Sequence, residues 1–109
     1  MPKRESGQQV AGTNKTQRPA TAEKNQALAT KISDHLQIVF GENLKSARAD
    51  CGLRQSDVAK LTGIPQQYLS RIELGKRNVT LKTMVLLSRV VERDVITMLR
   101  PAEIYAKKP

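Results

Sequence analysis

The chain has 109 residues, which suffice for one small domain with tails but are too few for two domains that each bury a workable core. Nineteen lysines and arginines against ten acidic residues give a net charge of +9, so nucleic acid is the first partner to consider and an anionic membrane the second. The single cysteine and single histidine exclude an intrachain disulfide and argue against a metal site.

The amino end, MPKRESGQQV, lacks the apolar centre of a signal peptide, and no apolar run approaches the roughly 18 residues of a membrane span. We therefore expect a cytoplasmic protein with no membrane partner. Residues 1–31 offer only Val10 and Leu28 as sizeable apolar groups, too few to offset the entropy of ordering. They are predicted to form a disordered basic arm, which acts either as a solubilising tail or as a segment that tracks along DNA.

Apolar residues then recur at steps of three and four, which predicts an all-α fold of about five helices. The helices are expected over residues 34–50, 55–62, 66–74, 81–91 and 95–100. In the first helix the apolar face comprises Leu36, Val39, Phe40, Leu44, Ala47 and Cys51. Cys51 is interpreted as a small buried residue rather than a reactive thiol, and His35 as a surface side chain.

The later helices also have expected inner faces and caps. Residues 55–62 place Val58, Ala59 and Leu61 on one face. In helix 81–91 the residues expected to face the core are Leu81, Met84, Val85, Leu87 and Val91. Thr80 and Asp94 are the expected amino-terminal caps of the last two helices.

Two short helices flank the turn Gly63-Ile64-Pro65, which is the arrangement of a helix-turn-helix, whose second helix enters the major groove of DNA. The segments LKSARADCGLRQSDVAKLTGIPQQYLSRIELGKRNVTLKTMVLLSRV and DVITML, within residues 44–99, resemble the Cro and phage-repressor family of DNA-binding domains. The resemblance implies a five-helix, lambda-repressor-like domain over residues 32–101, followed by a short tail over 102–109.

The resemblance also implies roles for individual residues. Positions that read bases correspond to Gln66, Gln67, Ser70 and Arg71. Positions that approach phosphates correspond to Arg54, Gln55, Tyr68, Lys76, Arg77 and Asn78. Arg48 and Glu73 match a pair that forms an ion pair in the family's phage repressors.

Side-chain chemistry supports these base-reading roles. Glutamine can bond adenine N6 and N7 together, arginine can bond guanine O6 and N7, and Gln67 and Arg71 lie one turn apart on one face. The alternative is that these polar residues form only the solvated face of an amphipathic helix.

Three residues depart from the family pattern. Arg54 and Pro65 stand where the family usually has serine or threonine, and neither offers a side-chain oxygen to the helix amides. Arg54 also places a cation at the positive end of a helix. Glu92 replaces a glycine after the fourth helix, so the turn there is expected to differ.

The leading hypothesis is a regulator that binds double-stranded DNA as a homodimer and represses transcription from an inverted-repeat operator. The candidates for a dimer face are Val90, Val95, Ile96, Met98, Leu99, Ile104 and Tyr105. The alternative is an antitoxin or adaptor that holds a protein partner through its arm and regulates its own operon. No enzyme, cofactor or metal is expected, because no catalytic constellation is present.

Overall fold

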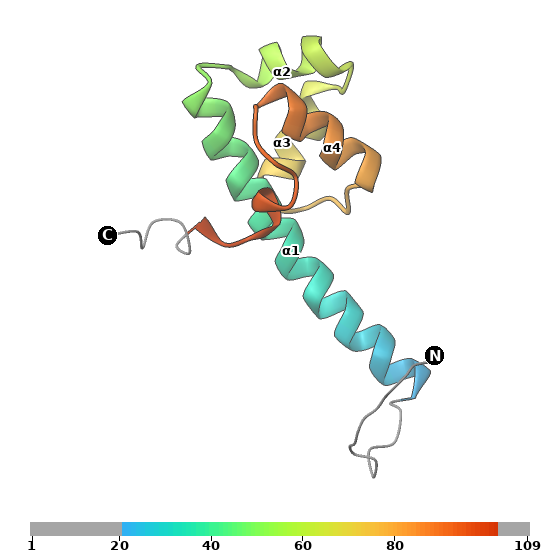
Figure 1. Cartoon of the computed structure of the whole chain (residues 1–109). Helices are drawn as coiled ribbons and strands as arrows, with labels where there is room; N and C mark the ends of the chain where they lie inside the picture. The colour runs from blue at the N-terminus through green and yellow to red at the C-terminus, as the bar shows by residue number, and fades with distance from the viewer. Residues whose placement is uncertain (1–20, 103–109) are drawn as a thin grey trace, which may run out of the picture.

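The computed structural model describes residues 21–102, which form four α-helices and one 3-10 helix and contain no strand. The helices are α1 (Ala22–Asp50), α2 (Gln55–Thr62), α3 (Gln66–Glu73) and α4 (Leu81–Val90), followed by the 3-10 helix η1 (Thr97–Leu99). Figure 1 shows α2, α3 and α4 gathered around the carboxyl half of α1, while its amino half projects from that body. The all-α prediction is confirmed, but residues 21–102 form four α-helices rather than five.

The helix α1 begins at Ala22 rather than near Asp34, so the prediction of a disordered arm over residues 1–31 is wrong for residues 22–31. Thr21 caps the helix by accepting a hydrogen bond from the Lys24 N–H at 3.3 Å. Lack of buried apolar surface does not prevent this extension, because elongating a helix that is already nucleated is far less costly than starting one. Residues 1–20 of the expected arm lie outside the described residues.

The core is formed where the carboxyl half of α1 meets the other helices. Its fully buried side chains come from every helix and from the turn after α4: Phe40, Leu44, Ala47, Val58, Leu69, Ile72, Leu87, Val91 and Met98. Gly41 lets α3 approach α1 closely, because a Cβ at this position would collide with the carbonyl oxygens of Ile72 and Glu73. This close contact fixes α3 across α1.

The turn between α2 and α3 begins with a residue whose backbone conformation ends α2. Gly63 has a φ of 79°, a left-handed conformation that ends α2 at little steric cost. Thr62 secures the turn, since its hydroxyl donates to the Val58 carbonyl at 2.7 Å and accepts from the Ile64 N–H at 3.1 Å. The two helices are thereby held in one fixed orientation.

The expected inner faces of α2 and α4 are only partly correct. Met84, Leu87 and Val91 face the core, but Leu81 and Val85 do not: their side chains are 74% and 45% exposed. Leu61 is also exposed. The reason is geometric, because these side chains lie at the edge of their apolar stripes, where no other part of the described chain covers them.

The expected last helix, over residues 95–100, is reduced to η1. Arg100 is extended, with φ −107° and ψ 140°, as the residue before a proline prefers, so the helix cannot continue. Asp94 acts as a cap, since its carboxylate accepts from the Thr97 N–H at 3.1 Å. Thr80 caps α4 in the same way through the Thr83 N–H.

Candidate nucleic-acid interface

The recognition surface begins with α3, whose two faces differ sharply. Leu69 and Ile72 are buried against α1 and α2, whereas Gln66, Gln67 and Arg71 are exposed on the opposite side. None of these three exposed side chains forms a hydrogen bond or ion pair within residues 21–102. Their amide and guanidinium groups are therefore available to an external partner.

A hollow of about 430 Å³ lies on this outer face, between α3 and the segment that follows it. It is lined by Gln67, Ser70, Arg71, Leu74 and Lys76. Leu74 was not predicted as a site residue from the sequence, although an apolar side chain at the end of a polar helix face is a signal for one. Leu74 is 63% exposed and offers the surface an apolar contact.

Behind this face, Arg48 of α1 and Glu73 of α3 form a bidentate ion pair. Arg48 Nε and a terminal guanidinium nitrogen donate to the two carboxylate oxygens of Glu73 at 2.6 and 2.9 Å. The two side chains are only 15% and 5% exposed, and the hydrogen bond that Arg48 donates to Glu73 raises the pKa of Arg48. Arg48 also donates to the Leu53 carbonyl at 3.0 Å, which ties α1 to the start of α2.

Gln55, at the start of α2, belongs to the same network. Its Nε2 donates to Oε1 of Glu73 at 3.0 Å. The structure therefore places Gln55 beside α3 with its amide nitrogen engaged by Glu73. Glu73 thus accepts hydrogen bonds from both Arg48 and Gln55, and Arg48 offsets its negative charge.

Arg54 lacks a side-chain capping oxygen, as expected, and it is held instead by Asp57. The Asp57 carboxylate accepts from the Arg54 backbone N–H at 2.8 Å and from its guanidinium at 3.3 Å. These contacts, led by the backbone hydrogen bond, lower the pKa of Asp57. The only carboxylates of α2 and α3, Asp57 and Glu73, are thus both paired with cations.

The segment after α3 carries the remaining candidate residues. The Arg77 guanidinium lies 4.6 Å from the centre of the Tyr68 ring, so the two side chains form a cation–π pair. Lys76 is exposed at the hollow, whereas Asn78 lies beside Val79 on the edge of a separate, apolar groove. The structure therefore gathers Lys76 with the polar face of α3 and separates Asn78 from that cluster.

Comparisons with known proteins agree with this geometry. A helix-turn-helix family model matches residues 44–95. Control protein C.SmaI of Serratia marcescens is 31% identical over 61 residues, covering 56% of this chain and 73% of that protein. The uncharacterized HTH-type transcriptional regulator y4dJ of Sinorhizobium fredii is 33% identical over 65 residues, covering 60% and 84%. The chain belongs to the Cro/C1-type helix-turn-helix family.

A solved structure supports the same assignment. The restriction-modification controller protein C.AhdI from Aeromonas hydrophila superposes with a TM-score of 0.54 at 30% identity, covering 59% of this chain and 96% of that one. As a member of this family, the 109-residue chain is a DNA-binding transcriptional regulator, and the family is not enzymatic. None of the helices formed by residues 21–102 is long and apolar enough to span a membrane.

Proposed function

We propose that this regulator represses transcription as a homodimer bound to an inverted-repeat operator. The observation that carries the proposal is the outer face of α3, where Gln66, Gln67 and Arg71 are exposed and form no hydrogen bond within residues 21–102. Glutamine and arginine side chains can each bond a base edge at two atoms, so this exposed face presents the donors and acceptors that read sequence in DNA. A duplex major groove admits such a helix.

In this proposal Gln66, Gln67, Ser70 and Arg71 read bases, and Leu74 meets a thymine methyl group. Phosphates on either side are held by cations and by hydrogen-bond donors from α2, α3 and the segment after α3. These phosphate contacts are assigned to Arg54, Gln55, Tyr68, Lys76 and Arg77, whereas Asn78 is not included because it lies on the edge of the apolar groove. Asp57 is paired with Arg54, and Glu73 with Arg48. These ion pairs support the assignment, because free carboxylates would repel the phosphate backbone of DNA.

Dimerisation is proposed because one recognition helix reads only a few base pairs. Two copies on related half-sites supply the discrimination that one copy lacks. Met98 takes no part in a dimer face, since it is 1% exposed and completes the core. Ile104 and Tyr105 lie outside the described residues. Repression follows from occupancy, because a protein bound over a promoter blocks access to it.

Selection of bound sequences from random duplex DNA tests the proposal directly. We expect an inverted repeat whose half-sites are about 10 base pairs apart, centre to centre. Binding in the same assay should weaken steeply with salt, since the contacts to phosphate release counterions. Recovery of no preferred sequence would refute specific operator binding, and a single unrepeated site would refute the twofold arrangement.

A further inference from the structure

The amino half of α1 lacks a partner within the described chain. Residues 22–32 are exposed throughout, and Figure 1 shows this half standing clear of the other helices. Leu28 and Ile32, which are 55% and 58% exposed, lie one turn apart and form what we call the α1 ridge. Two large aliphatic side chains exposed on one face favour a packing partner.

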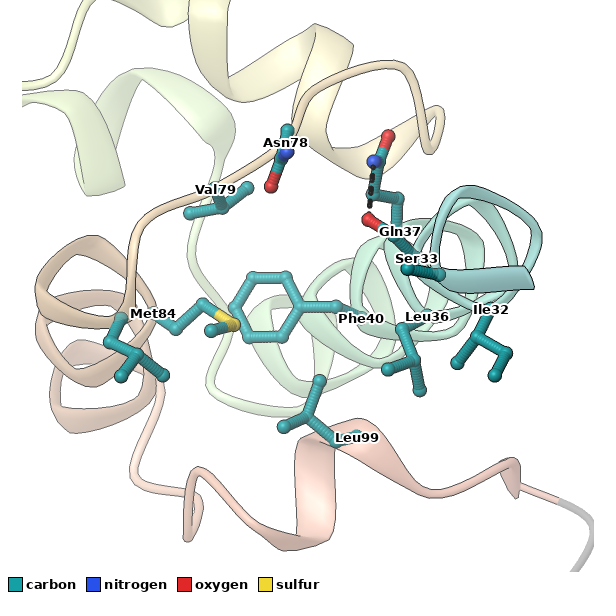
Figure 2. Close-up of a pocket in the computed structure, with 11 residues that line it drawn as sticks. Ile32, Ser33, Leu36, Gln37, Phe40, Asn78, Val79, Met84 and Leu99 are labelled. Carbon is teal, nitrogen blue, oxygen red and sulfur yellow. Dashed lines mark hydrogen bonds between the residues drawn. The ribbon is translucent and has the colours of Figure 1, made fainter. Parts of the chain in front are cut away.

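The α1 ridge runs into an apolar groove of about 540 Å³ between α1, α4 and η1. The groove is formed mainly by Leu36, Phe40, Val79, Leu81, Met84 and Leu99. Figure 2 shows Phe40, Met84 and Leu99 converging on one space, with Leu36 and Ile32 following along α1. Leu81 on the opposite wall is the most exposed large aliphatic side chain among the described residues, at 74%.

The chemistry of the groove excludes DNA as its occupant. No charged side chain lines it, and its polar side chains include Gln37, whose amide donates to the Ser33 hydroxyl at 3.2 Å. A phosphate backbone has no counter-charge here. A contiguous apolar surface of this kind is typical of a contact between proteins.

Few large apolar side chains of this chain lie outside the described residues. Residues 1–20 contain only Met1 and Val10 as large aliphatic side chains. Residues 103–109 contain Ile104 and Tyr105 as their only large apolar side chains and follow Ala102, which lines a different hollow together with Asn43. A partner that brings its own apolar helix is therefore favoured.

We propose that a second copy of this chain occupies the groove, with the α1 ridge of each copy seated in the groove of the other. A twofold contact requires one continuous patch that is complementary to itself, and here a projecting ridge and a receiving groove adjoin on one surface. The inference rests on the proposed function and deepens it, because it names the surface that forms the dimer.

Sedimentation of the full-length chain and of four single variants tests this interface. Ile32→Asp and Leu81→Asp each place a carboxylate in the contact, one on the ridge and one on the groove wall. Leu61→Asp on α2 is the matched control at 60% exposure, and Ile96→Asp, at 56%, probes the alternative face near η1. Circular dichroism shows whether each variant keeps its helical content.

We expect the wild-type chain and Leu61→Asp to sediment as dimers with equal dissociation constants. Ile32→Asp and Leu81→Asp should each raise the constant by at least roughly a hundredfold, because each buries an unpaired charge. A dimer that resists both variants but is broken by Ile96→Asp overturns this interface and leaves the proposed function intact. A monomeric wild-type chain also overturns this interface. Failure of the operator selection with dimerisation intact would instead count against the function alone.

Discussion

Gln67 and Gln55 are both glutamines near the recognition surface, but they differ in what they already bind. Gln55 donates to Glu73, whereas the side chain of Gln67 forms no hydrogen bond within residues 21–102. An engaged amide is held in place and suits a contact of fixed geometry, such as a phosphate. A free amide at the hollow on α3 can adopt the orientation that a base edge requires.

For Gln67→Ala we predict a loss of about 1–3 kcal/mol of binding free energy on the preferred site, with relaxed preference at one base pair. The same pattern is expected for Gln66→Ala and Arg71→Ala. Lys76→Ala is the contrasting variant: it should keep the sequence preference and lower the slope of log affinity against log salt by about 0.9. Competition binding against a panel of single-base operator variants measures both effects. If Gln67→Ala weakened binding equally on every sequence, Gln67 would not be a base-reading residue.

Glu92 is the only residue other than glycine with a positive φ among residues 21–102, at 59°. It ends α4 in a Schellman motif, in which the Arg93 N–H donates to the Ser88 carbonyl at 2.9 Å and the Glu92 N–H to that of Arg89 at 3.2 Å. This turn was expected to differ from that of the family, but it keeps a glycine-like geometry. A side chain in this conformation carries strain.

Glu92→Gly should therefore raise the free energy of unfolding by roughly 0.5–1 kcal/mol, since relief of left-handed strain exceeds the added entropy of the unfolded chain. Gly63→Ala is the reciprocal control. Its new Cβ meets nothing within 4 Å, so its expected loss of roughly 1 kcal/mol comes from the backbone alone. Urea denaturation of both variants measures these changes. Destabilisation by Glu92→Gly would show that its side chain has a stabilising role that outweighs the strain.

At the level of elements, the start of α2 combines weak capping with a cation. Asp57 satisfies the Arg54 N–H, but no side-chain oxygen accepts from the first amides of α2. The Arg54 guanidinium is 81% exposed and held to Asp57 only at the surface, so it can turn toward a phosphate. This arrangement suggests that helix stability is exchanged for affinity at this end.

Arg54→Ser should stabilise the free protein by about 1 kcal/mol, because serine supplies the missing cap and removes a cation from the positive end of the helix. The same change should weaken DNA binding and lower its salt dependence. Thermal melting and operator binding are measured on the same preparation. A higher melting temperature with unchanged affinity would retain the capping argument and reject the phosphate contact, while a lower melting temperature would reject the capping argument.

The Arg48–Glu73 pair joins α1 to α3 and is largely shielded from water. Removing either partner strands the other, so Arg48→Met and Glu73→Gln should each cost about 3–5 kcal/mol of unfolding free energy. The double variant should lose much less than the sum, because both changes remove one interaction. Chemical denaturation of the complete cycle measures the coupling.

Arg93 and Asp50 supply a matched surface pair for comparison. Arg93 donates to Asp50 at 2.7 Å, but the two side chains are 37% and 62% exposed. Arg93→Met should therefore cost at most about 1 kcal/mol. Equal losses for this pair and for the Arg48–Glu73 pair would contradict the importance assigned to burial.

At the scale of the whole molecule, the net charge of +9 and the apolar groove predict opposite responses to salt. Operator binding should weaken with salt because it displaces counterions from DNA. Dimerisation through the groove should be nearly insensitive to salt, because it buries apolar surface. The two equilibria can therefore be separated in one titration.

On DNA we predict two chains per operator, with half-site centres about 34 Å apart, one helical turn of the duplex. Sedimentation of the complex gives the stoichiometry, and chemical footprinting gives the spacing. The Leu61→Asp variant should leave both unchanged, because its side chain lies outside the groove. One chain at each high-affinity site would contradict the dimer.

Local sequence signals determined the all-α class, the two short helices and the turn between them. Gly63, Thr80 and Asp94 act within a few residues of their own position, so their roles could be predicted from neighbours alone. The pairing of Arg48 with Glu73, by contrast, was available only through the family resemblance. Nothing local to either residue indicates that partner.

Tertiary structure decided what depends on distant parts of the chain. Ala22–Lys31 are helical because α1 extends from its packed half, and Leu81 is exposed because no distant segment reaches it. The contact of Gln55 with Glu73 and the groove beside the α1 ridge also arise only when separate helices meet. The physical reason is that capping and turns are short-range effects, whereas burial depends on which surfaces the whole fold brings together.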